Sequence, residues 1–134
     1  MLKRFVRGLF RSEGQEHVGA SPKEQASFVL VFDGLEIGVL TVRDGVWEFK
    51  YSSEFRKQAD APDRVLPLID FPDVAKVYRS EDLWPFFMSR IPSVAQPKVI
   101  EEIERRGLDQ TSAPELLRAF GERSIANPFR LIPT

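Results

Sequence analysis

The sequence contains no cysteine, which excludes disulfide bonds, thiol chemistry and thiolate metal sites. Its one histidine, His17, has no second ligand candidate nearby and is predicted to be solvated. No apolar stretch approaches the roughly 20 residues that a membrane-spanning helix needs. Residues 1–14 mix basic and apolar side chains, so no export signal is predicted. We therefore expect a cytoplasmic protein without a membrane span.

The net charge is close to zero, because 19 basic and 20 acidic residues leave a formal charge of -1. The strong positive field that attracts nucleic acid is missing, so no direct nucleic-acid binding is predicted. No glycine-rich phosphate loop, calcium-loop spacing or nucleophile with a placed base occurs. The sequence therefore predicts no catalytic, cofactor-binding or metal-binding residue, and we expect the protein not to be an enzyme.

The chain divides into two parts. In residues 1–27, apolar side chains between Leu2 and Phe10 recur at helical spacing with basic residues between them, and a polar linker follows. This basic amphipathic arm would either dock on the rest of the protein or serve as a surface anchor or partner arm. Residues 28–134, in a chain of 134, have the length and composition of one globular domain.

Extended patterns dominate the first part of that domain. Residues 28–43 predict a hairpin with Asp33 and Gly34 at its turn, and Asp44 with Gly45 predicts a second tight turn. The alternation in residues 46–51 places Trp47, Phe49 and Tyr51 on one face, which is predicted to be buried. Residues 63–72 predict an irregular edge strand, since prolines limit central strand pairing.

Helical patterns follow. One helix is predicted to begin near Asp82 and to stop before Pro92. A second is predicted from Pro97 to Arg106 with a cap at Gly107, a third from Ser112 to Gly121, and a closing strand near residue 130. The expected fold is α+β, with a curled antiparallel sheet or a small barrel-like meander and about three helices packed on one side.

The helix after residue 82 is crowded with large apolar side chains. Successive helical residues lie about 100° apart, so one face cannot bury all of them. Phe87 is predicted to be in the core, as is Trp47 of the third strand. The residues predicted to contact a partner are Trp84, Phe86, Met88 and Arg90. Trp84 stands first among them because tryptophan is enriched in interface hot spots, although a core position is an equally good interpretation.

An ordered series of short patterns resembles the N-terminal subdomain of the HipA family of bacterial serine/threonine kinases. The patterns are a Gly-x-Leu strand, a Gly-x-x-x-Phe-x-Tyr strand, an aromatic pair followed by proline, an LL-x-x-x-G helix and a strand ending near proline. The matching residues are Gly38 and Leu40; Gly45, Phe49 and Tyr51; Phe86, Phe87 and Pro92; Leu116, Leu117 and Gly121; and Leu131 and Pro133. The chain departs from the family pattern in residues 65–72, 89–92 and 122–129.

Because the subdomain stands without a kinase, the chain resembles the HipS-like proteins of split, HipBST-type toxin–antitoxin modules. The resemblance implies a non-catalytic, antitoxin-like protein that binds and neutralises a HipA-related kinase toxin, in a complex that can include a DNA-binding antitoxin. The alternative is an accessory or scaffold domain of the same fold that binds another protein without inhibiting it.

Overall fold

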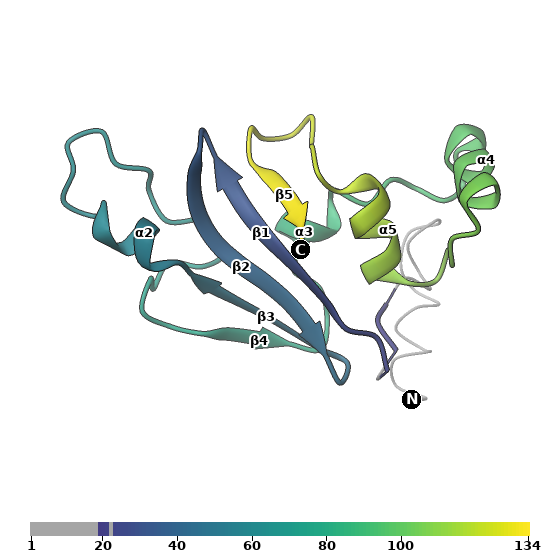
Figure 1. The fold of residues 1–134 in the computed structure, drawn as a ribbon, viewed down its shortest axis with the longest axis horizontal. Helices are drawn as coiled ribbons and strands as arrows, with labels where there is room; N and C mark the ends of the chain where they lie inside the picture. The colour runs from purple at the N-terminus through teal and green to yellow at the C-terminus, as the bar shows by residue number, and fades with distance from the viewer. Residues whose placement is uncertain (1–18, 22) are drawn as a thin grey trace.

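The computed structural model describes residues 19–21 and 23–134 and shows an α+β domain built on a five-stranded antiparallel sheet (Figure 1). The strand order is β4-β3-β2-β1-β5, so β4 and β5 form the edges of an open sheet rather than closing a barrel. The strands are β1 (Ala26–Phe32), β2 (Leu35–Arg43), β3 (Val46–Tyr51), β4 (Tyr78–Ser80) and β5 (Arg130–Pro133). The predicted α+β class and curled sheet are confirmed.

The predicted meander of β1, β2 and β3 is confirmed together with both of its turns. Asp33 and Gly34 have φ values of 49° and 81°, and Asp44 and Gly45 have values of 54° and 77°. These left-handed conformations match the twist that two-residue hairpin loops require, and glycine adopts them without steric cost. The turns therefore set the register of all three strands.

One face of the sheet carries the core. Trp47, Phe49 and Tyr51 of β3 are all buried, as predicted, and Leu40 of β2 lies opposite Phe49. Gly38 lies opposite Tyr51, and a Cβ atom at Gly38 would stand 2.7 Å from the Phe49 ring and 2.5 Å from the Lys50 carbonyl. Glycine at this position lets the Phe49 ring lie directly on the β2 backbone.

The prediction of an edge strand at residues 63–72 is wrong. This segment forms no strand, and Tyr78–Ser80 pairs with β3 at that edge instead. Pro67 lacks an N–H for strand pairing, as do the other prolines of this stretch. The sequence patterns did not indicate the short helix α2 (Ser53–Lys57), which is capped by Ser52, whose hydroxyl accepts a hydrogen bond from the Phe55 N–H.

Three further helices are α3 (Pro85–Met88), α4 (Pro97–Arg106) and α5 (Ala113–Phe120). The predicted start near Asp82 is wrong, because Trp84 is extended, with ψ 149°, and the helix begins at Pro85. Proline disfavours a helical conformation in the residue before it. The bounds of α4 are confirmed, and Gly107 ends it in the left-handed conformation. None of the helices in the described residues is long and apolar enough to cross a membrane.

Helices α3 and α5 contribute to the same core as the sheet. Phe87 of α3 and Leu116 and Leu117 of α5 are fully buried in the cluster that contains Phe49 and Leu131. Part of the predicted linker also belongs to the packed domain, since Ala20 is buried and the Gly19 carbonyl accepts a 2.7 Å hydrogen bond from the Ala113 N–H. The predicted amphipathic helix, with its apolar residues between Leu2 and Phe10, and the linker up to residue 18 lie outside the described residues.

Candidate functional site

The residues predicted to contact a partner surround the short helix α3. Phe87 points into the core, whereas Trp84, Phe86 and Met88 are half-buried and pack against the edge of the core. The Trp84 ring meets the Phe71 ring edge-on at 5.1 Å between centroids. Trp84 therefore combines a contact with the core and a partly exposed surface.

Phe86 lies in a different environment from Trp84. Its ring meets the Phe129 ring at 5.8 Å between centroids, and the Arg90 guanidinium carbon is 5.8 Å from its centre. Trp84 contacts Phe71 and Phe87, whereas Phe86 contacts Phe129 and Phe87 and lies near Arg90. The two aromatic side chains therefore share Phe87 as a neighbour but otherwise have different surroundings.

The placement of Arg90 in a surface patch is corrected by the structure. Arg90 is only 3% exposed, and its guanidinium donates four hydrogen bonds to the chain between α5 and β5. The acceptors are the carbonyls of Gly121, Glu122 and Phe129 and the Asn127 side-chain oxygen, at distances of 2.7 to 3.2 Å. Arg90 fastens this connection in place and is not available to a partner.

The electrostatic state of Arg90 follows from these contacts. All four acceptors are neutral, and its Nε is buried with no hydrogen-bond partner in the described part of the chain. Burial lowers the pKa of Arg90, because the charged form loses hydration that neutral carbonyls replace only in part. An arginine side chain nevertheless stays protonated across the physiological range.

A second group of polar contacts organises the irregular segment that follows α2. The buried Tyr51 hydroxyl accepts a 2.9 Å hydrogen bond from the Leu68 N–H and donates a 2.6 Å bond to the Phe71 carbonyl. Burial raises the pKa of Tyr51 to about 12, so the phenol is neutral at physiological pH. The sequence patterns identified Tyr51 only as a core residue, and its alternating position in β3 gave no signal of this second role.

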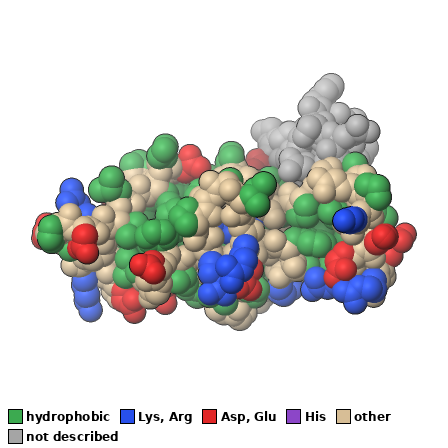
Figure 2. Space-filling model, turned by 90° about the horizontal axis from the view of Figure 1, so that it is seen from above, with side chains coloured by type: hydrophobic (Ala, Val, Ile, Leu, Met, Phe, Trp, Pro, Cys, Tyr) green, Lys and Arg blue, Asp and Glu red, His purple; other side chains and the backbone are tan. Residues whose placement is uncertain are grey.

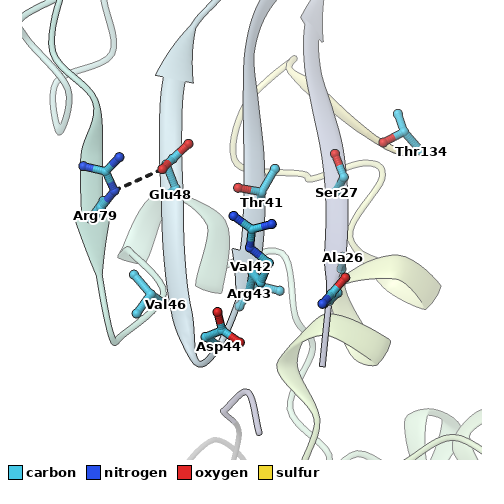
Figure 3. Close-up of a pocket in the computed structure, with 11 residues that line it drawn as sticks. Ala26, Ser27, Thr41, Val42, Arg43, Asp44, Val46, Glu48, Arg79 and Thr134 are labelled. Carbon is cyan, nitrogen blue, oxygen red and sulfur yellow. Dashed lines mark hydrogen bonds and ion pairs between the residues drawn. The ribbon is translucent and has the colours of Figure 1, made fainter. Parts of the chain in front are cut away.

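The opposite face of the sheet bears an open hollow of about 730 Å³ near the β2–β3 turn. Side chains of β1, β2, β3 and β4 surround it, and Arg79 of β4 is joined to Glu48 of β3 at 3.1 Å (Figure 3). Ser27, Thr41 and Thr134 add hydroxyl groups. This surface offers hydrogen bonds and charges of both signs, as ordinary solvated sheet faces do. No group of three metal-ligating side chains occurs within residues 19–21 and 23–134.

No protein-family model matches the chain, and no curated protein sequence matches it.

Proposed function

We propose that this protein is a non-catalytic binding module that neutralises a HipA-related serine/threonine kinase in the cytoplasm, as an antitoxin does. The support is the resemblance to the HipA N-terminal subdomain, together with the way its patterns are used in the fold. Several residues of these patterns lie together in the core of the domain.

The observation that carries the proposal is the pairing of two of these patterns across β2 and β3. Gly38 of the Gly-x-Leu pattern lies opposite Tyr51 of the Phe-x-Tyr pattern, and Leu40 lies opposite Phe49. The two patterns thus form one packing unit in which the Phe49 ring occupies the space that a Gly38 side chain would fill. The Phe49 ring can take this position only because residue 38 has no side chain, which is a physical reason for the two patterns to occur together.

Residues of the remaining patterns pack in the same core. Phe87 packs 5.6 Å from Phe49 between ring centroids, and Leu116, Leu117 and Leu131 are fully buried in the same cluster. These patterned residues therefore belong to the framework of the domain. The function that it implies is carried by surface residues, which is why the kinase has to be tested directly.

The proposal is tested by co-expression with a HipA-related kinase encoded beside this protein. The kinase alone should arrest growth, and co-expression of this protein should relieve the arrest and give a complex that survives purification. A stable complex with undiminished arrest would favour the accessory or scaffold function instead. Absence of any complex would remove the proposal.

A further inference from the structure

The segment between α2 and β4, residues 58–77, presents two large apolar side chains to solvent. Leu66 is 64% exposed and Ile69 is 96% exposed. Figure 1 shows this loop projecting beyond α2, at the end of the molecule opposite α4. Figure 2 shows hydrophobic, acidic and basic side chains exposed at that end. Single exposed apolar residues are common on protein surfaces, so the meaning of this pair depends on how the loop is held.

Side-chain hydrogen bonds hold the first part of the loop. The Gln58 amide donates a 2.9 Å bond to the Val65 carbonyl and accepts a 2.7 Å bond from the Val65 N–H. This two-point contact fixes the backbone directly before Leu66. Gln58 itself follows α2, whose Phe55 ring stacks on Tyr51 at 4.6 Å between centroids.

The second part of the loop is anchored in the core on both sides of Ile69. Leu68 and Phe71 are buried, and their backbone groups bind the Tyr51 hydroxyl. The Phe71 N–H also donates a 3.0 Å bond to the Leu68 carbonyl, which makes Ile69 and Asp70 the central residues of a β-turn. Ile69 therefore stands at the tip of a turn whose two ends are fixed in the core.

Prolines restrict the same segment further. Pro67 and Pro72 flank the turn, and each fixes its own φ angle. A loop that is already ordered loses little conformational entropy on binding, so exposed side chains on it can contribute most of their burial energy to a complex. The loop thus has the properties of a preformed binding element with Leu66 and Ile69 as its apolar anchors.

The charges around these anchors indicate the chemistry of the partner. Asp60, Asp63, Asp70 and Asp73 are exposed in the loop, against the basic Arg64 and Lys76. The four aspartates outnumber the two basic groups of the loop, and Arg56 and Lys57 are exposed on the adjoining α2. The aspartates around the two anchors complement a protein surface on which lysine or arginine residues surround an apolar pocket.

We infer that the loop of residues 58–77 inserts Leu66 and Ile69 into an apolar pocket, rimmed by basic side chains, on the partner protein. This inference rests on the proposed function for the choice of partner, which is the HipA-related kinase. The half-buried Trp84 is then a secondary contact, because its ring is already engaged by Phe71.

The test compares three purified proteins in calorimetric titrations against the purified kinase. They are the wild type, a Leu66→Ser/Ile69→Ser double variant and an Ile125→Ser control, which removes a fully exposed isoleucine from the connection between α5 and β5. The double variant should bind at least tenfold more weakly with an unchanged melting temperature, and the control should bind like the wild type. Wild-type affinity in the double variant would overturn the inference while leaving the proposed function standing. Absence of wild-type binding would overturn both.

The charge component has its own test in association kinetics. An Asp63→Asn/Asp70→Asn variant should associate more slowly with the kinase at low salt and show a weaker salt dependence than the wild type. The matched control, Glu101→Gln/Glu104→Gln, removes two exposed acids from α4 and should change neither quantity. Equal effects of the two variants would contradict a specific contribution of the loop aspartates to association with the kinase. Light scattering that shows loss of a homodimer in the Leu66→Ser/Ile69→Ser variant would identify a second copy of this chain as the occupant and overturn the kinase assignment.

Discussion

Replacing Arg90 with methionine gives the strongest test of how the C-terminal part of the domain is held. Methionine keeps an apolar stem of similar length but removes all donors from the four acceptors between Gly121 and Phe129. The Gly121 carbonyl bond is buried, so this acceptor would be left without a partner at a cost of about 1 to 3 kcal/mol. The other three acceptors are half-buried and can regain water, which limits their loss to about 0.5 to 1 kcal/mol each.

These costs are partly offset, because methionine removes the penalty of burying a charge that no carboxylate balances. We therefore expect the free energy of unfolding to fall by about 3 kcal/mol. The measurement is urea unfolding of Arg90→Met beside Arg118→Met, an exposed arginine on α5 whose loss should change stability by less than about 0.5 kcal/mol. Hydrogen exchange adds a local measurement, because release of residues 121–129 should expose the amides of β5 before those of β2. A decrease in the free energy of unfolding below about 1 kcal/mol, or equal amide exchange rates in β5 and β2, would refute the interpretation that Arg90 holds residues 121–129 in place.

Three other perturbations test separate parts of the account. Folding stability should fall by about 2 kcal/mol as pH rises from about 10 to about 12, because the folded Tyr51 phenol keeps its proton while the unfolded one loses it; a Tyr51→Phe variant that keeps the full slope would contradict this. Gly38→Ala should cost about 2 kcal/mol or more in chemical unfolding, since the new methyl group meets the Phe49 ring and the Lys50 carbonyl; a neutral effect would mean that β2 shifts freely. Trp84→Ala should lower stability by about 2 kcal/mol through lost packing on Phe71 and weaken kinase binding less than the Leu66→Ser/Ile69→Ser change does; a larger effect on binding would restore Trp84 as the main anchor.

Much of the fold could be predicted from local patterns because local chemistry determines it. The turns at Asp33 and Asp44 need residues that accept positive φ, and Gly107 meets the same need at the end of α4. The alternation in β3 identified its buried face because one side of a sheet packs on the core. The hairpin strands β1 to β3 and the helix α4 were therefore found with correct or nearly correct bounds.

The parts that could not be predicted depend on contacts between residues distant in sequence. The loop of residues 58–77 is organised by the Tyr51 hydroxyl, which binds backbone groups 17 and 20 residues away. Arg90 follows a helix, where a basic side chain is ordinarily solvated, and its acceptors lie 31 to 39 residues further on. Neither arrangement leaves a periodic signal. The candidate site changed accordingly, from a patch that included Arg90 to a loop whose exposed anchors lie on buried supports.

Neutralisation of a HipA-related kinase by direct binding can be measured through the phosphoryl-transfer activity of the purified kinase, titrated with this protein at kinase concentrations far above the dissociation constant. If the proposed function is correct, we expect the kinase activity to fall linearly to background at one equivalent of this protein. Full kinase activity at several equivalents, in a solution where the complex is shown to be present, would contradict it.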